Sequence, residues 1–228
     1  MRRSLRFALG VAACVLAATV AASAPAAHRA VAGRFEVVRP WAGGAVRLFD
    51  LPGGHVIATT SRGVFGGPVV LGVVSTRGPW AEVTSELVPD GVPAWVNLTS
   101  VEVSTVGTAI RVQLAARRLE VVRGGRLLRS FRVAVGAPGS PTPTGRYAVA
   151  EKLPGRAAGS GYGCCVLALT ARQETPPGGS TPATWFVAIH GGSGIGSAVS
   201  AGCLHLPDAA LRYLMRTVPL GAPVFIDR

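Results

Sequence analysis

Short runs rich in apolar positions dominate the first half of the chain and predict β-strands. Glycine- and proline-rich turns such as Pro52-Gly53-Gly54 and Pro89-Asp90-Gly91 separate these runs. Several short strands between Phe35 and about Thr105 are typical of a small β-barrel. The predicted strands are Ala45–Phe49, His55–Thr60, Pro68–Ser75, Trp80–Leu87 and Ala94–Asn97.

A second β-rich unit is predicted from about Thr108 to Arg228. Gly124-Gly125 is a favoured two-residue hairpin loop, and it joins Arg118–Arg123 to Arg126–Val135. Every second residue from Phe131 to Val135 is a large apolar one, so one face of this strand is predicted to be more apolar than the other. Further strands are predicted at Gly145–Leu153, Val166–Thr170, Trp185–His190 and Val224–Ile226.

One helix is predicted after Pro207. Asp208 in its first turn suits the positive end of a helix, and Pro219 and Gly221 end the helix. Apolar residues spaced three and four apart form one face that predicts contact with a core. They are Leu211, Leu214, Met215 and Val218. The second unit is therefore predicted to be mainly β, with one short helix.

Composition narrows the classes of function. The chain has 228 residues, 49% of them hydrophobic, which is enough for one large domain or two small ones. Its formal charge is +12, carried by arginines and by Lys152 alone among lysines. Because no basic run interleaved with aromatic residues accompanies this charge, no nucleic-acid partner is predicted. A basic surface would suit an anionic wall polymer.

The N-terminus predicts export. Three arginines precede the apolar stretch Phe7–Ala22, and small residues follow up to Ala27. This order is that of a secretory signal peptide over residues 1–27, and the apolar stretch is short for a permanent membrane span. We therefore expect the mature protein in the cell envelope, in the periplasm or the cell wall. In a less favoured interpretation Val11–Cys14 is a lipoprotein box that leaves Cys14 lipidated.

Cysteine usage indicates a free thiol. Outside the predicted signal peptide the cysteines are Cys164, Cys165 and Cys203, an odd number in an exported protein. At least one of them must remain free or bond to another molecule. The sequence leaves open whether the adjacent Cys164 and Cys165 bond to each other, since such a bond is strained, or whether either bonds to Cys203.

The free thiol is expected in a segment that suits nucleophilic catalysis. Cys203 follows Gly202, which lets backbone amides approach a substrate carbonyl, and it precedes the predicted helix, whose positive end would lower the pKa of a thiol. His190 ends a predicted strand before Gly191-Gly192, where a general base could sit. A zinc site made of Cys203, His205 and His190 has too few ligands at recognised spacings. No metal and no cofactor are predicted.

Two blocks in this unit resemble the L,D-transpeptidase (YkuD) catalytic domain family. The first block is VAVGAPGSPTPTGRYAVAEK, residues 133–152, which is similar to that family's Thr-Pro-Thr-Gly segment. The second is residues 186–226, with a strand ending in His-Gly and then Ser-Ala-Gly-Cys before a short helix. Residues 65–83 and 90–97 resemble bacterial SH3-like domains. The resemblance implies an SH3-like domain over residues 35–105 and an L,D-transpeptidase-type β-sandwich over residues 108–228.

The resemblance assigns roles to particular residues. Cys203 would be the nucleophile and His190 its base, with the main chain at Gly191 orienting the ring. Backbone N–H groups around Gly202 and Cys203 would form the oxyanion hole, and Ser200 would shape the turn. The family's usual histidine before Gly-Cys is Ala201 here, and an arginine position is His205. His205 and Tyr162 are therefore candidate substrate-binding residues.

The activity that the resemblance implies is peptidoglycan cross-linking. Cys203 would form a thioester with the third residue of one stem peptide, and an amine of another stem peptide would resolve it. A carbapenem would be expected to acylate Cys203. The alternatives are an L,D-carboxypeptidase or cysteine peptidase, in which water resolves the thioester, and a catalytically inactive wall-binding protein, which Ala201 and the SH3-like half would fit.

Overall fold

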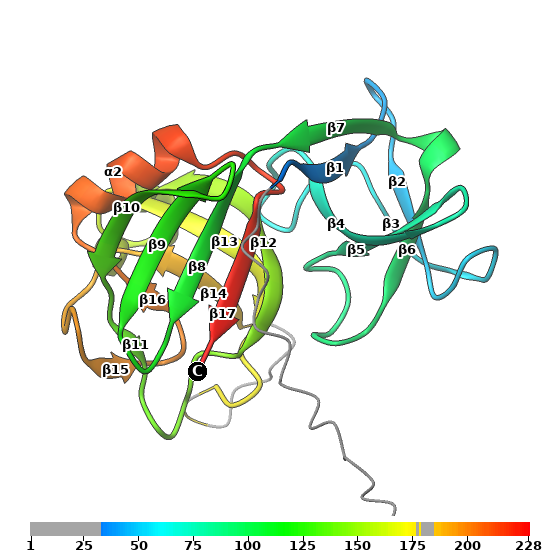
Figure 1. The fold of residues 1–228 in the computed structure, drawn as a ribbon. Coiled ribbons are helices and arrows are strands. Elements are labelled where there is room, and N and C mark those ends of the chain that lie inside the picture. The colour runs from blue at the N-terminus through cyan, green and yellow to red at the C-terminus, as the bar shows by residue number, and fades with distance from the viewer. Residues whose placement is uncertain (1–32, 177, 179–184) are drawn as a thin grey trace, which may run out of the picture. The chain divides into compact units, whose positions relative to one another are not determined.

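The computed structural model describes residues 33–176, 178 and 185–228, so the predicted signal peptide and Cys14 lie outside the described residues. Two large sheets and one two-stranded sheet make up the described part (Figure 1). The first sheet is built from residues 35–106 and the other two from residues 108–227. The fold is mainly β, as predicted.

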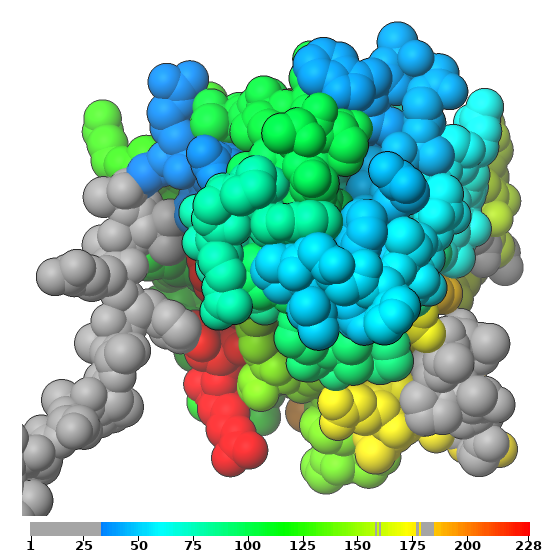
Figure 2. All heavy atoms as spheres, turned by 90° about the vertical axis from the view of Figure 1, so that its right-hand side faces the viewer, coloured from blue at the N-terminus to red at the C-terminus, as the bar shows by residue number. Residues whose placement is uncertain are grey.

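The N-terminal sheet has seven antiparallel strands in the order β3-β2-β6-β5-β4-β1-β7. They are β1 (Phe35–Arg39), β2 (Val46–Phe49), β3 (Val56–Thr60), β4 (Leu71–Arg77), β5 (Trp80–Thr84), β6 (Ala94–Asn97) and β7 (Glu102–Val106), and the single turn η1 (Leu98–Ser100) precedes β7. Apolar residues that alternate along these strands fill one core, which includes Val38, Leu48, Leu71, Val83 and Val96. This sheet, blue to green in Figure 2, faces the viewer there. Its SH3-like assignment stays a prediction.

Two strands of this sheet differ from the predicted bounds. The strand β4 begins at Leu71 rather than Pro68, and proline has no N–H to give to a ladder. The strand β5 ends at Thr84 rather than Leu87. There the Leu87 N–H donates to the Ser85 hydroxyl at 3.2 Å, a local turn that replaces sheet pairing.

The second large sheet has eight strands in the order β10-β9-β8-β17-β12-β13-β14-β16. Most pairs are antiparallel, but β8 pairs with β17, and β14 with β16, in parallel. The two-stranded sheet pairs β11 (Val135–Gly136) with β15 (Ala198–Ser200). The eight strands are β8 (Thr108–Gln113), β9 (Arg118–Arg123), β10 (Arg126–Arg132), β12 (Gly145–Pro154), β13 (Cys165–Arg172), β14 (Phe186–His190), β16 (Leu204–His205) and β17 (Pro223–Asp227).

The predicted strand Arg126–Val135, with apolar and polar side chains alternating up to Val135, is wrong at its C-terminal end. The strand β10 stops at Arg132, and Val133, Ala134 and Val135 are all buried. Ala134 leaves the edge of the sheet and forms an antiparallel bridge to His205, so the chain there is covered on both sides. A long-range contact, which a local pattern does not contain, decides this burial.

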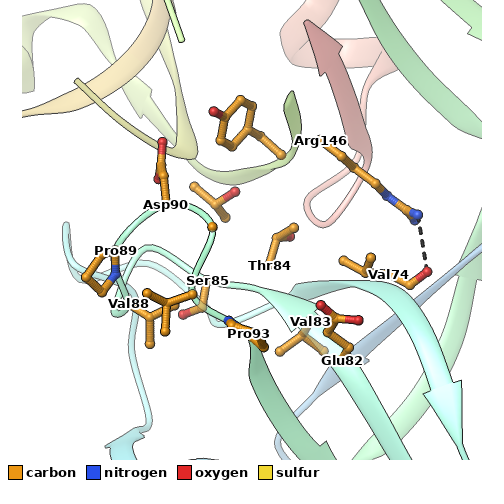
Figure 3. Close-up of a pocket in the computed structure, with 14 residues that line it drawn as sticks. Val74, Glu82, Val83, Thr84, Ser85, Val88, Pro89, Asp90, Pro93 and Arg146 are labelled. Atoms are coloured by element: carbon orange, nitrogen blue, oxygen red, sulfur yellow. Dashed lines mark hydrogen bonds between the residues drawn. The ribbon is translucent and has the colours of Figure 1, made fainter. Parts of the chain in front are cut away.

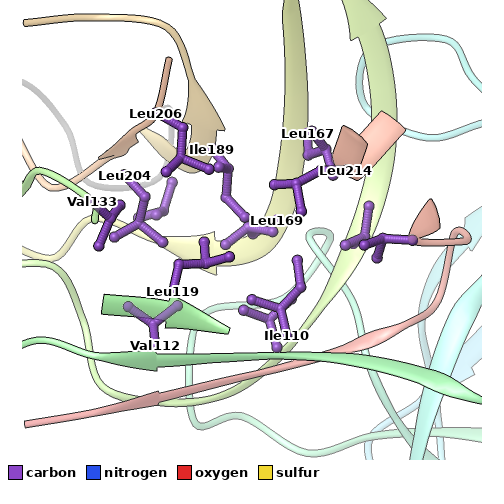
Figure 4. Close-up of a cluster of buried hydrophobic side chains, with 14 of the residues drawn as sticks. Ile110, Val112, Leu119, Val133, Leu167, Leu169, Ile189, Leu204, Leu206 and Leu214 are labelled. Carbon is purple, nitrogen blue, oxygen red and sulfur yellow. The ribbon is translucent and has the colours of Figure 1, made fainter. Parts of the chain in front are cut away.

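The predicted helix is α2 (Asp208–Thr217), and it buries Ala210, Leu211 and Leu214. Two shorter helices that were not predicted, α1 (Gly155–Ala158) and η2 (Ser160–Tyr162), lie between β12 and β13. Figure 4 shows the core of this half, where side chains of several strands and of α2 meet. Its fully buried members include Leu119, Leu167, Leu169, Ile189, Leu204, Leu206 and Leu214. This core fixes β14 and β16, which carry the candidate site.

Candidate active site

Cys203 lies immediately before β16 and directly after Gly202. The φ angle of Gly202 is +111°, which favours glycine, and a Cβ there would collide with the side-chain amide of Gln173. Cys203 keeps a free, partly buried thiol, whose Sγ lies 3.9 Å from the carbonyl oxygen of Phe186. The turn therefore requires glycine and presents the cysteine beside β14.

Burial raises the pKa of the Cys203 thiol, and the backbone of Ala188 offsets this only in part. The expectation that the helix after Cys203 lowers this pKa is wrong. At the first residue of α2, the Asp208 carboxylate instead accepts the Cys164 N–H at 3.0 Å. Desolvation of the sulfur is the largest cause of the raised pKa, so the resting cysteine is a neutral thiol.

His190 ends β14 and is only 8% exposed. Its Nδ1 lies 2.5 Å from the carbonyl oxygen of Gly191, so Nδ1–H donates to that carbonyl and Nε2 is left as the acceptor. Burial lowers the pKa of His190 to about 4, while the Gly191 hydrogen bond raises it and the charge of His205 lowers it further. The imidazole is therefore neutral at pH 7 and has a defined tautomer.

Strand pairing sets where Cys203 and His190 lie relative to each other. The strands β14 and β16 pair in parallel, with Ile189 opposite Leu204 and His190 opposite His205. Cys203 precedes this register by one residue, so it is level with Ala188 and shares a face with His190, two residues along. No hydrogen bond among the described residues joins the thiol to the imidazole. Catalytic hydrogen bonds are commonly long before substrate binds.

Two aromatic neighbours flank the His190 ring. The ring centroid of Tyr162, which precedes His190 in the chain, lies 4.6 Å from that of His190. The ring centroid of His205, which follows it, lies 4.8 Å away. The Nδ1 of His205 is 3.0 Å from the carbonyl oxygen of Ser193, and the carbonyl of Tyr162 accepts the Gly191 N–H at 2.8 Å. Both candidate substrate-binding residues therefore border the predicted base.

The turn before Cys203 contains the remaining predicted residues. The Ser200 hydroxyl donates to the Cys203 carbonyl at 2.6 Å and accepts the Gly202 N–H at 3.2 Å. The Gly202 amide is thus engaged within the turn. Ala201 contributes its carbonyl, which accepts from the side-chain amide of Gln173 at 2.9 Å.

Sequence reasoning missed two buried polar residues beside this turn, Thr142 and Gln173. The Thr142 hydroxyl donates to the Gly202 carbonyl at 2.8 Å. The Thr-Pro-Thr-Gly resemblance marked the segment that contains Thr142, but it gave that residue no task. Gln173 carries no local signal, because only the tertiary fold brings β13 next to the Cys203 turn.

Cys164 and Cys165 form a disulfide with each other, which the sequence left open. Cys165 is buried at the start of β13, and Cys164 is only partly buried. Because this bond does not involve Cys203, the candidate nucleophile retains its sulfhydryl.

A cavity of about 160 Å³ lies away from these residues (Figure 3). It is lined by Thr84, Asp90, Arg146 and Tyr147 among others, and by neither Cys203 nor His190. Within the described ranges no three His, Cys, Asp or Glu side chains are grouped as a metal site would require. This cavity is therefore separate from the thiol and the imidazole of the candidate site.

A free thiol and a neutral imidazole at neighbouring strand ends of a β-sheet define a class of proteins equipped for cysteine-based acyl transfer. The family model of the L,D-transpeptidase catalytic domain, YkuD, matches residues 107–226, just over half of the chain. The chain belongs to this family. It is 28% identical over 124 residues to a Bacillus subtilis protein named L,D-transpeptidase YkuD, which covers 54% of this chain and 68% of that protein.

Solved structures give weaker likenesses. An L,D-transpeptidase from Mycobacterium smegmatis has a TM-score of 0.43 at 18% identity, covering 69% of this chain and 82% of that one. A crystal structure of an Enterococcus faecium L,D-transpeptidase has a TM-score of 0.39 at 18% identity, covering 53% of this chain. The chain spans half the length of the latter protein.

Proposed function

We propose that the protein is an exported peptidoglycan L,D-transpeptidase that cross-links third residues of stem peptides. The family match over residues 107–226 carries the proposal. The free thiol of Cys203, directly before the strand that pairs with the His190 strand, supports it, because both groups that acyl transfer needs are present. The name of a curated relative from Bacillus subtilis also describes an L,D-transpeptidase.

The first half-reaction begins from a neutral thiol and a neutral imidazole. His190 Nε2 takes the Cys203 proton as the sulfur attacks the carbonyl carbon of the third stem residue. The carbonyl oxygen becomes an oxyanion, for which a backbone N–H of the Cys203 turn is the proposed donor. Collapse of this intermediate breaks the bond to D-Ala, whose nitrogen receives the proton from His190. A thioester remains on Cys203.

The second half-reaction restores the enzyme. An amine of another stem peptide attacks the thioester carbonyl and gives a proton to His190. The C–S bond breaks, the thiolate takes that proton, and a new amide joins the two stems. The hydrogen bond from Nδ1–H to Gly191 keeps Nε2 available in both halves.

The direct test uses tetrapeptide-containing muropeptides with the mature protein. We expect a cross-linked dimer and released D-Ala from the wild type, and neither from Cys203→Ala, which removes only the sulfur. Released D-Ala without a dimer would identify the L,D-carboxypeptidase or cysteine peptidase instead. Binding to sacculi that survives Cys203→Ala, with no turnover and no carbapenem acylation of the wild type, would identify a wall-binding protein.

Export is proposed from the predicted signal peptide. In the part of the chain that the structure describes, no helix is both long and apolar enough to cross a membrane. The intact mass of the secreted protein distinguishes cleavage near Ala27 from lipidation at Cys14. A mass that retains residues 1–27 without lipid would contradict both.

An anionic wall polymer is the proposed second partner. The segment from Arg117 to Arg132 forms the hairpin β9–β10, and β10 is the edge strand of its sheet. Its one acidic residue, Glu120, pairs with Arg118 at 3.3 Å. Exposed like charges on an edge strand attract polyanions, although they also deter edge-to-edge aggregation. The exposed arginines are Arg117, Arg118, Arg123, Arg126, Arg129 and Arg132.

A further inference from the structure

We propose that Thr142 and Gln173 are positioning residues that aim the Cys203 N–H at the oxyanion of the acyl-transfer step. This inference rests on the proposed function. Neither residue touches the reacting atoms, and neither belongs to the catalytic pair. Both are buried, at 4% and 2% exposure, and both bind main-chain carbonyls of the turn that presents Cys203.

Three successive carbonyls of this turn each accept a hydrogen bond from a different side chain. Gln173 Nε2 donates to Ala201 at 2.9 Å, Thr142 Oγ1 to Gly202 at 2.8 Å, and Ser200 Oγ to Cys203 at 2.6 Å. Buried side-chain donors rarely converge on one short turn, because each must reach a specific carbonyl. The path of the main chain is therefore fixed by side chains as well as by sheet pairing.

Fixing a carbonyl also fixes the next N–H. A trans peptide is planar, so the C=O of Gly202 and the N–H of Cys203 point in opposite directions. Because Thr142 holds the Gly202 oxygen, the Cys203 N–H must point away from Thr142. The other amide predicted for the oxyanion hole, that of Gly202, already donates to Ser200. The Cys203 N–H is the one left for the substrate.

The hydroxyl of Thr142 has a single hydrogen, and it is donated to the Gly202 carbonyl. Its oxygen accepts the Gly136 N–H at 2.9 Å, so its proton is directed to the Gly202 carbonyl. Through this contact the Thr-Pro-Thr-Gly segment supports the turn before Cys203, although it lies about 60 residues earlier in the chain.

Gln173 ties the same segment to the turn from the other side. Its Nε2 donates to Pro141 at 3.1 Å as well as to Ala201, and its Oε1 accepts the Thr175 N–H at 3.1 Å. The Thr175 contact requires the amide oxygen on that side, so the nitrogen must face the carbonyls. Segment 140–142 and turn 200–203 are thus held as one unit.

The experiment compares two reactions of Cys203 in the mature protein. Attack on a carbapenem carbonyl creates an oxyanion, whereas displacement of iodide from iodoacetamide creates none. In Thr142→Val, which keeps the shape and removes the hydroxyl, we expect the acylation rate constant to fall by about tenfold to a hundredfold. This is less than the roughly hundredfold to thousandfold loss on removing an oxyanion-hole donor, because the Cys203 N–H itself remains. Alkylation should stay within about twofold.

Thr142→Ser keeps the hydroxyl and should retain most of the acylation rate. Gln173→Met, which keeps the volume and removes the amide, should lower acylation selectively as Thr142→Val does. Circular dichroism shows whether each variant folds. If Thr142→Val does not fold, the acylation rate of Thr142→Ser still tests the inference.

Equal losses in acylation and alkylation would overturn the inference, as would a Thr142→Ser variant that loses acylation. An unchanged acylation rate in folded Thr142→Val would do the same while leaving the proposed function intact. A wild type that is alkylated but neither acylated nor active on muropeptides overturns the proposed function, and this inference with it.

Discussion

At the scale of residues, the site is electrically neutral at rest. Burial raises the pKa of Cys203 and lowers that of His190 to about 4. A thiolate–imidazolium pair would place two charges in this poorly solvated position, which desolvation opposes. In the proposed mechanism the proton would therefore move only as the sulfur attacks, with His190 as a general base rather than as the partner of a standing thiolate.

This neutrality predicts the pH dependence of thiol reactivity. Because the pKa of Cys203 is raised, the rate constant for iodoacetamide alkylation should keep rising from about pH 7 to beyond about pH 9. Since His190 stays neutral down to about pH 4, no second step near pH 6.5 is expected. The measurement is intact mass against time, with Cys203→Ser as the unreactive control. A plateau near neutral pH would instead indicate an ion pair.

At the scale of elements, one carboxylate of the second half holds a loop of the first. Glu151 on β12 is 1% exposed, and its oxygens accept the N–H groups of Phe65 at 2.6 Å and Gly67 at 2.5 Å. The Phe65 ring also meets the Phe186 ring of β14 at 5.6 Å. The loop before β4 is therefore anchored to two strands that support the site.

Glu151→Gln is expected to lower the free energy of unfolding by about 1–3 kcal/mol, the usual cost of an unmatched buried polar group. The amide keeps one acceptor oxygen, but its NH2 group would face the second N–H donor. Urea denaturation measures the change. Glu36→Gln is the matched control, because Glu36 is exposed. Equal stability of both variants and the wild type would show that the anchor contributes nothing.

At the scale of the whole molecule, positive charge is unevenly distributed. The chain carries +12, and the β9–β10 hairpin presents a concentrated group of exposed arginines. Arg129 also lies 4.9 Å from the Tyr213 ring centroid, which brings α2 beside this strand. A surface of this kind attracts polyanions over a distance set by salt screening.

The triple variant Arg123→Gln, Arg126→Gln and Arg129→Gln is expected to weaken binding to long-chain polyphosphate by at least about threefold near 0.1 M salt. The difference should vanish near about 0.5 M salt, because screening shortens the range of these charges. The control triple is Arg34→Gln, Arg47→Gln and Arg77→Gln, which removes three exposed arginines of the N-terminal half. Equal weakening by both triples would show that only net charge matters.

Local pattern predicted much of the secondary structure. The strands β2, β3, β6 and β9 and the helix α2 lie within about one residue of their expected bounds, because turns and periodicity specify them. The pattern missed β1, β7 and β8 and the short strands β11, β15 and β16, and it placed Ala134 on the wrong face. These features depend on pairing between segments that are distant in the chain, such as β1 with β7, β8 with β17 and Ala134 with His205.

The amino-acid sequence by itself determined the mainly β class and the presence of one cysteine and one histidine in a recognisable order, since both follow from local spacing. Tertiary structure alone decided that Cys164 bonds to Cys165, that Cys203 and His190 are neutral, and that Thr142 and Gln173 hold the turn. The physical reason is that pKa values and buried hydrogen bonds depend on which distant segments exclude water from a group, and local patterning does not encode those neighbours.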